Sequence, residues 1–348
     1  MTLERKSTRR QRNAPTINDV AQKAGVSPMT VSRVINGGQV VRPAMRERVE
    51  QAIAELNYAP SAAARSLAGG EERRIALLYS NPSAAYLSEF LVGSLDQASR
   101  SGVTLVIERW DEGTSVEGVI AHLQRSRVDG VLLPPPLCDL EPLTQALQRA
   151  GVAAVAVATS RPPQGMPVVS IDDHRAAYEM TRHLLQLGHR RIGFIRGNPN
   201  QHASGRRYEG YLAALAEAGV AQDEALTGPG LYTYRSGLEA AGKLLDLPDP
   251  PTAIFAANDD MAAAAVAAAH RRGLDVPGDL SVCGFDDSAI ATTIWPELTT
   301  IRQPISAMSR QAVELLVRQL GGRDAGEPPA SVLLDYELIR RQSDGPPR

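Results

Sequence analysis

The chain has 348 residues, a formal net charge of −2 and two cysteines, and these values already exclude several classes of protein. The length exceeds that of one small domain and suits a binding head followed by a larger body. No apolar run is long enough to span a bilayer, and the first residues are polar and basic, unlike a signal peptide, so we expect a cytoplasmic protein without membrane contact. Cys138 and Cys283 lack metal-ligand spacing, so we expect buried thiols, no metal and no cofactor.

The charge is distributed unevenly along the chain. Residues 1–60 contain ten Lys/Arg and five Asp/Glu, a net charge of +5, so the other 288 residues carry −7. A basic N-terminal part and an acidic remainder favour nucleic acid as a partner at one end of the chain only. For residues 1–13 we expect a disordered, solvated basic tail, and an added non-specific affinity for DNA stays an alternative.

Residues 16–36 have the pattern of two short helices joined by a tight turn. Thr16 and Asp19 have the spacing of a capping box at the start of the first helix, and Gly25 suits the turn after it. Ser27 suits the N-cap of the second helix and Pro28 its first position. Apolar residues fall on one side of this second helix, so a polar and basic side faces outward, with Met29, Thr30, Ser32 and Arg33. A helix-turn-helix unit presents such a helix to the major groove of DNA.

A third helix and an Ala-rich stretch follow. Pro43 opens the third helix, which runs to Leu56 with an apolar stripe. Arg42 stands at the expected N-cap, where it either weakens the cap or places a cation near a phosphate. Residues 61–70 have high helix propensity but are too few for a stable isolated helix, so we expect them to fold only conditionally.

Four ordered segments of residues 16–60 carry a family resemblance: Asp19-Val20-Ala21, Ala24-Gly25-Val26-Ser27, Thr30-Val31-Ser32-Arg33-Val34 and Leu56-Asn57-Tyr58-Ala59-Pro60. They closely resemble the N-terminal domain of the LacI/GalR family of bacterial transcription regulators. The resemblance implies a homodimer on a pseudo-palindromic operator. The residues it assigns to DNA contact are Thr16, Ile17, Ser27, Pro28, Met29, Thr30, Ser32, Arg33, Asn36, Arg42, Tyr58, Ala64 and Leu67.

The same resemblance makes residues 61–72 a hinge helix and linker. Leu67 matches the leucine that wedges into the minor groove at the centre of the operator, and Ala64 matches the small residue that lets two hinges approach. Such a wedge kinks DNA, and the wider protein–DNA interface that the kink permits offsets the cost of unstacking. The alternative is that Leu67 only anchors a linker to the body.

From Arg74 onward, short apolar strands alternate with amphipathic helices. The expected strands are residues 75–79, 103–107, 131–133, 155–157, 192–195, 253–256 and 280–285, and the main helices are residues 86–101, 175–187, 207–218 and 259–272. Continuous apolar strands indicate parallel sheets that are covered on both faces. We therefore expect an α/β body of two doubly wound lobes, like that of periplasmic binding proteins, with a ligand cleft between the lobes.

The resemblance extends over residues 14–343 and implies that the lobes interleave in sequence. Lobe 1 takes residues 73–172 and 303–329, and lobe 2 takes residues 173–302 and 330–343, with residues 332–339 as a last strand on lobe 2. The helix-turn-helix domain takes residues 14–60. No heptad tail follows the body, so the sequence does not support a tetramerising coiled coil.

Polar residues at strand ends are the candidates for the ligand site. Arg207, Asn258 and Asp286 match the effector-binding residues of the family, and a guanidinium, an amide and a carboxylate together suit the hydroxyls of a sugar. Tyr86 and Tyr232 fall where relatives carry pocket aromatics, with core packing as the alternative.

Further candidates complete the ligand site by the same resemblance. Asn81 and Ser83 fall in the first loop, and Asn81 stands where Asp is common, so the effector need not be the family's usual one. For Trp295 we expect either a position at the mouth of the cleft or ordinary packing in the core. Asp259 and Asp287 are also expected as helix N-caps, and Arg207 could instead form a surface ion pair.

The sequence therefore predicts a ligand-responsive, sequence-specific repressor, associated with the nucleoid, of genes for carbohydrate uptake or catabolism. A periplasmic sugar-binding protein would need a signal peptide and would lack the head. An enzyme would need a catalytic constellation, and the chain has no phosphate-cradling Gly loop, HExxH or GxSxG motif, so we expect no enzyme. The residues do not decide whether the small molecule releases or recruits DNA.

Overall fold

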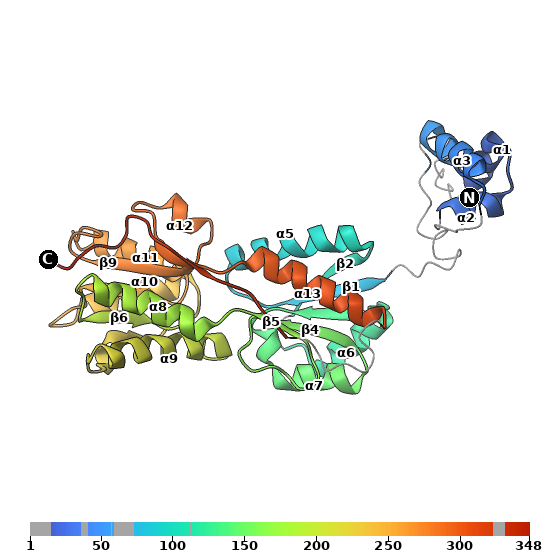
Figure 1. The fold of residues 1–348 in the computed structure, drawn as a ribbon. Coiled ribbons are helices and arrows are strands. Elements are labelled where there is room, and N and C mark those ends of the chain that lie inside the picture. Colours follow the sequence, from blue (N-terminus) through green and yellow to red (C-terminus); the bar gives the residue numbers. More distant parts are fainter. Residues whose placement is uncertain (1–14, 36–40, 57, 59–72, 111–112, 323–330) are drawn as a thin grey trace, which may run out of the picture. The chain divides into compact units, whose positions relative to one another are not determined.

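A computed structural model describes residues 15–35, 41–56, 58, 73–110, 113–322 and 331–348 (Figure 1). The chain divides into two compact units, Met1–Glu72 and Arg73–Arg348, which we call the head and the body. Three predicted DNA contacts, Asn36, Ala64 and Leu67, lie outside the described residues.

The head contains the three predicted helices, α1 (Ile17–Ala24), α2 (Pro28–Ile35) and α3 (Pro43–Leu56). Thr16 and Asp19 form the predicted capping box, and Gly25 ends α1 in the left-handed conformation at φ 64°, which glycine adopts without strain. The hydroxyl of Ser27 accepts a hydrogen bond from the backbone N–H of Thr30 at 3.2 Å, as expected of an N-cap. The helix-turn-helix prediction is confirmed.

The core of the head explains why these short helices stay folded. Apolar residues of all three helices and Tyr58 form one buried cluster, with Val20, Val31 and Val49 fully buried. Helices of eight residues are too short to be stable in isolation, so tertiary packing supplies most of their stability. Lys23 of α1 and Glu55 of α3 add an ion pair of 2.7 Å, both partly exposed, so its contribution is small.

Lobe 1 of the body is built on a six-stranded sheet with the order β11-β5-β4-β3-β1-β2. All of its strand pairs are parallel, as predicted for covered apolar strands. Its elements are β1 (Arg74–Tyr79), α5 (Ala84–Ser101), β2 (Thr104–Arg109), α6 (Val116–Arg125), β3 (Gly130–Leu133), η1 (Leu137–Asp139), α7 (Glu141–Arg149), β4 (Ala153–Val157), β5 (Val168–Ser170), α13 (Ile305–Leu320) and β11 (Ser331–Leu333).

Lobe 2 repeats this architecture with the strand order β12-β10-β9-β8-β6-β7. Its one antiparallel pair joins β10 and β12. Its elements are α8 (Asp173–Gln186), β6 (Ile192–Ile195), α9 (His202–Glu217), η2 (Glu224–Leu226), β7 (Thr227–Gly228), α10 (Tyr234–Leu245), β8 (Ala253–Ala256), α11 (Asp259–His270), β9 (Ser281–Asp286), α12 (Ile290–Thr293), β10 (Thr299–Arg302) and β12 (Glu337–Ile339).

The last part of the chain differs from the prediction. Residues 332–339 do not form one strand on lobe 2, because Ser331–Leu333 pairs with β5 in lobe 1 and Glu337–Ile339 pairs with β10 in lobe 2. The chain thus passes from one lobe to the other between β11 and β12. Each strand has only three residues, and an apolar pattern that short does not show which sheet it joins.

Helices cover both faces of each sheet, so the strands of the sheet centre are buried (Figure 1). In lobe 1, α5 packs along α13, and Gly93 makes this possible, because a Cβ there would lie 2.1 Å from the backbone oxygen of Ser306. This closed packing leaves the carboxyl ends of the strands as the polar edge of each sheet. Within the described residues, we find no helix both long and apolar enough to cross a membrane.

Candidate ligand and DNA sites

Residues from both lobes meet in one small cavity at the carboxyl ends of the strands. It has a volume of about 30 Å³. Seven of the eight predicted ligand residues line it: Asn81, Ser83, Tyr86, Arg207, Tyr232, Asn258 and Asp286. Trp295 does not line it, and its side chain is 75% exposed in the segment after α12, so it is not a core residue and its place at the mouth of the cleft stays a prediction.

Arg207 is the centre of the charged part of this cavity. Its Nε donates to Asp173 at 2.8 Å, its Nη1 donates to the backbone oxygen of Ala257 at 2.6 Å, and its guanidinium lies 3.6 Å from the ring centroid of Phe285. The side chain is 6% exposed. Burial lowers the pKa of Arg207, but the combined effect of Asp173, Tyr232 and Asp286 outweighs burial and raises the pKa overall. Arg207 is therefore a buried cation and not a surface ion pair.

Asp286 is the second charged group and ends strand β9. Its Oδ1 accepts a hydrogen bond from Nε2 of Gln303 at 2.6 Å and lies 3.7 Å from Nη1 of Arg207. Burial raises the pKa of Asp286 to about 7, and the charge of Arg207 opposes that rise. Its backbone has φ 112°, a conformation that is strained for a residue with a Cβ and that occurs preferentially at functional sites.

Two neighbouring carboxyl groups do not play the predicted part. Asp259 is not the N-cap of α11, because Asn258 holds that position and accepts from the N–H of Met261. Asp259 instead accepts hydrogen bonds from Ser288 and Thr300, and burial raises its pKa well above the usual value. Asp287, also predicted as a cap, forms ion pairs with Arg302 and Arg341 at 2.7 Å and 2.6 Å.

The side chains of the two asparagines of the cavity form hydrogen bonds with backbone groups. Asn81 accepts from the N–H of Ser83 and donates to the backbone oxygen of Pro135, and Asn258 donates to the backbone oxygen of Tyr232. They line the cavity, but their main effect is to fix the loops around it. Gly197 leaves room for the ring of Tyr232, because a Cβ there would lie 2.1 Å from a ring carbon.

Sequence reasoning missed several residues of the cavity, namely Pro135, Ala158, Gln201, Ala203 and Gln303. Gln303 directly follows β10, and the pairing of Arg302 in β10 with Asp286 in β9 places it beside Asp286. Among the described residues, Oη of Tyr86, Nε2 of Gln201 and Oε1 of Gln303 are buried without a hydrogen-bond partner. Such atoms are costly in an empty core and are available to a polar ligand.

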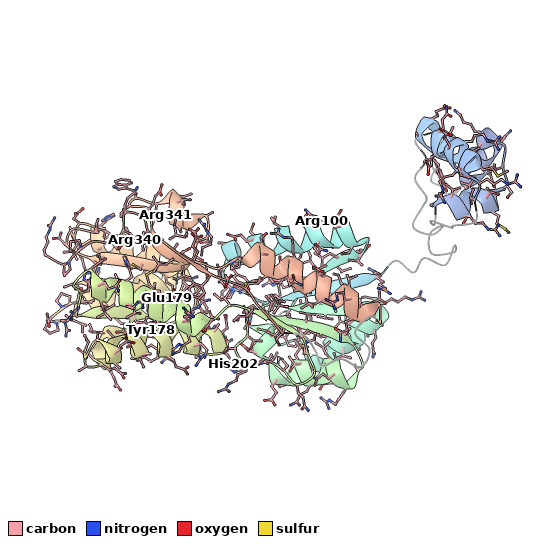
Figure 2. The ribbon with its side chains drawn as sticks, viewed as in Figure 1. Arg100, Tyr178, Glu179, His202, Arg340 and Arg341 are labelled. Carbon is pink, nitrogen blue, oxygen red and sulfur yellow. The ribbon has the colours of Figure 1, made fainter. Side chains whose placement is uncertain are left out.

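Two direct contacts join the lobes beside the cavity. The hydroxyl of Ser83 donates to Asp260 at 2.9 Å, which links the start of α5 to α11. The backbone N–H of His202 donates to Asp139 at 2.8 Å, and Nδ1 of the same imidazole lies 2.9 Å from that carboxylate. Figure 2 shows His202 where α9 of lobe 2 meets lobe 1.

The head presents the predicted face of α2 to solvent. Ser27, Pro28, Met29 and Arg33 are exposed, Thr30 and Ser32 are partly exposed, and the side chain of Met29 is 65% exposed. Arg33 lies along the helix with its Nη2 3.7 Å from the sulfur of Met29. Arg42 is exposed directly before α3, where its backbone oxygen, not its side chain, accepts the first hydrogen bonds of the helix.

Three residues predicted to contact DNA also have structural roles within the head. Tyr58 is only 8% exposed and packs in the core of the head, so its ring is a core residue. Ile17 also packs against this core and is half-buried. The hydroxyl of Thr16 donates to Asp19, so in this structure it serves the cap of α1.

A helix-turn-helix head followed by a two-lobed body with a polar cavity between the lobes defines a class of protein, the DNA-binding regulators that respond to a small molecule. Residues 16–61 match the bacterial regulatory proteins of the lacI family, and residues 181–343 match the periplasmic binding protein-like domain. The chain belongs to the LacI family of transcriptional regulators.

Individual relatives extend over nearly the whole chain. The HTH-type transcriptional regulator CelR of Thermobifida fusca is 37% identical, covering 96% of this chain and 99% of its own. A CelR-cellobiose complex has a TM-score of 0.72 at 35% identity, over 94% of this chain and 99% of that one. A lac repressor dimer bound to operator and the anti-inducer ONPF has a TM-score of 0.78 at 29% identity, and the match covers 94% of this chain and 98% of that one.

Proposed function

We propose that this chain is a homodimeric repressor of carbohydrate genes whose affinity for DNA is set by a sugar bound between the two lobes. One observation carries the ligand part: seven residues selected from five separate stretches of sequence line the same interlobe cavity. The relatives support the proposal, since one is solved with cellobiose and another as a dimer on its operator.

The chemistry of the cavity favours a neutral, hydroxyl-rich ligand. The charge of Arg207 is already balanced by Asp173 and faced by Asp286, so no free cation lines the cavity within the described residues. An anionic sugar would meet these carboxylates without a counter-charge. The unpartnered atoms of Tyr86, Gln201 and Gln303 include both donors and acceptors, as ring hydroxyls require.

The body also offers a surface for a second copy of the chain. Val92 and Leu95 on α5 and Ile107 on the edge strand β2 are large apolar side chains that are about half exposed. An edge strand and an apolar helix face in one lobe are typical of an interface between subunits. A dimer would place two α2 helices on two half-sites of an operator.

Ligand control follows from the volume of the cavity. At about 30 Å³ it has room for little more than one water molecule, so a sugar enters only if the lobes move apart or side chains rearrange. Ser83 lines the cavity and binds Asp260 across the lobes, so we expect an entering ligand to change this interlobe contact. Ligand and DNA then influence each other by the same factor.

A role in binding, and not in catalysis, follows from the same groups. The carboxylates nearest the cavity are engaged by Arg207, Gln303, Ser288 and Thr300, which suits hydroxyl recognition better than proton transfer. We propose that the protein acts in the cytoplasm, where its DNA partner is found.

A thermal-shift screen of the full-length protein tests the proposal. Neutral sugars, sugar phosphates and nucleobases are compared, because a ligand stabilises the state to which it binds. We expect a neutral sugar to raise the melting temperature and to change affinity for DNA sites selected from a random pool. If only phosphorylated compounds or nucleobases stabilise the protein, or if the stabilising sugar leaves DNA affinity unchanged, the proposal is wrong.

A further inference from the structure

A second and much larger cavity lies beside the first. It has a volume of about 400 Å³, against about 30 Å³ for the cavity described above. Its walls come from η1, α7 and the loop after β4 in lobe 1 and from the start of α9 in lobe 2. Pockets that enclose small molecules usually measure about 300–1,000 Å³, so this one could hold a ligand part of the size of a sugar ring.

Three chain segments line both cavities in turn. Pro135 lines the small cavity and Asp139 the large one, four residues later in the same loop. Ala158 lines the small cavity and Arg161, three residues later, lines the large one. Of the consecutive residues Gln201 and His202, the first lines the small cavity and the second lines the large one. Because each segment borders the small cavity and then the large one, the two cavities adjoin at the edge of the lobe 1 sheet.

Asp139 holds this junction together. Its carboxylate is 1% exposed and accepts hydrogen bonds from the hydroxyl of Thr159 and from the backbone N–H of His202, with the His202 imidazole beside it. These partners come from both lobes, so the boundary between the cavities is also a contact between the lobes. A ligand that spans both cavities would change this contact together with the one between Ser83 and Asp260.

The lining of the large cavity suits hydroxyl groups. It presents the carboxylates of Asp139 and Glu141, three glutamine amides, the guanidinium of Arg161 and the imidazole of His202. Amides donate hydrogen bonds to hydroxyl groups and accept them, and carboxylates accept them, so this lining can satisfy the hydroxyls of a sugar. Because two carboxylates and only one guanidinium line the cavity, an anionic group on the ligand is also disfavoured there.

We propose that the effector is at least a disaccharide, with one sugar unit in the small cavity, expanded on binding, and the next unit in the large cavity beside Asp139 and His202. This inference rests on the proposed sugar effector and adds the number of sugar units that the effector contains. It makes the large cavity a subsite for the second sugar unit, and filling this subsite gives the disaccharide a higher affinity than the monosaccharide.

Calorimetric titration of the full-length protein with matched pairs tests this: glucose with cellobiose and maltose, and galactose with lactose. We expect one disaccharide to bind roughly ten- to thirtyfold tighter than its single unit, as two additional hydrogen bonds would provide. Gln164→Trp narrows the large cavity at an exposed position of its wall and should remove most of that advantage while leaving the monosaccharide unchanged. Gln186→Trp, at an exposed position of α8 that does not line the cavity, is the control and should change neither affinity.

The outcomes separate the two proposals. Equal affinity for the disaccharide and its unit would overturn the subsite and leave the sugar effector standing. The same holds if Gln164→Trp changes nothing, or if it weakens both sugars equally. If no saccharide of the panel binds, the sugar effector itself is wrong and the subsite falls with it.

Discussion

Replacing Arg207 by alanine should destabilise the body strongly, because the structure makes this residue the counter-charge of two buried carboxylates. Asp173, in contact at 2.8 Å, and Asp286, at 3.7 Å, would remain in a site where their side chains are 3% and 8% exposed. Removing one partner of a buried ion pair costs about 3–5 kcal/mol, since the remaining charge is left without compensation. We expect Arg207→Ala to lower the free energy of unfolding by that amount.

Urea unfolding of the full-length protein, followed by the fluorescence of Trp110 and Trp295 in the body, measures this loss. Arg206→Ala is the matched control, because Arg206 is the neighbouring arginine on α9 but pairs with Glu209 at the surface, where a pair contributes about 0–1 kcal/mol.

A second substitution tests the cause of the destabilisation. Asp173→Asn in the Arg207→Ala background removes the uncompensated charge, so the double variant should lose less stability than the sum of the two single variants. If Arg207→Ala costs no more than Arg206→Ala, or if the two substitutions simply add, the buried charge network does not stabilise the body as argued.

Three further predictions concern DNA binding and pH. Arg33→Ala should lower affinity for the selected operator by about 1–3 kcal/mol in fluorescence anisotropy, and an unchanged affinity would show that α2 is not the recognition helix. Leu67→Ala should reduce the DNA bend in a gel assay while leaving non-specific affinity and its salt dependence unchanged, and an unchanged bend would make residues 61–72 a passive linker. Burial raises the pKa of Asp286 to about 7, so between pH 4 and 7 the folded protein binds a proton that the unfolded chain has released. Stability should therefore fall as pH rises through this range, and Asp286→Asn should flatten the curve; a wild-type melting temperature that does not fall from pH 5 to 7.5 would contradict the assignment.

Much of the fold could be predicted because its patterns are local. Caps such as Thr16 with Asp19, the turn at Gly25 and the apolar strands of the body each depend on a few neighbouring residues. The ligand residues at the strand ends could be selected because parallel strands bring their carboxyl ends to one edge of a sheet. Arg207 and Asp286 are examples, and they lie 79 residues apart in the chain.

The misses depend on contacts that no local pattern records. Tyr58, predicted to contact DNA, also packs in the core of the head, and only the tertiary packing of the three helices determines this position. His202 acquires its surroundings only when the lobes meet, because its partner Asp139 lies in lobe 1. Gln303 reaches Asp286 only when β10 pairs with β9, which no local pattern of residues shows. For Trp295, the alternative of core packing is wrong, because the chain after the short helix α12 carries this large aromatic to the surface.

The position of the interlobe contacts indicates how a ligand can act on DNA binding. Ser83 lines the small cavity, and His202 directly follows a residue that does, so each contact between the lobes is within one residue of the ligand site. A ligand shifts an equilibrium only through its different affinity for the two states. On the proposed function, we expect a ligand larger than the present 30 Å³ to disturb these contacts, and we expect its hydrogen bonds with Gln201 and Gln303 to influence which arrangement of the lobes it stabilises. On this proposal, the side chains that recognise the effector also determine which state it prefers.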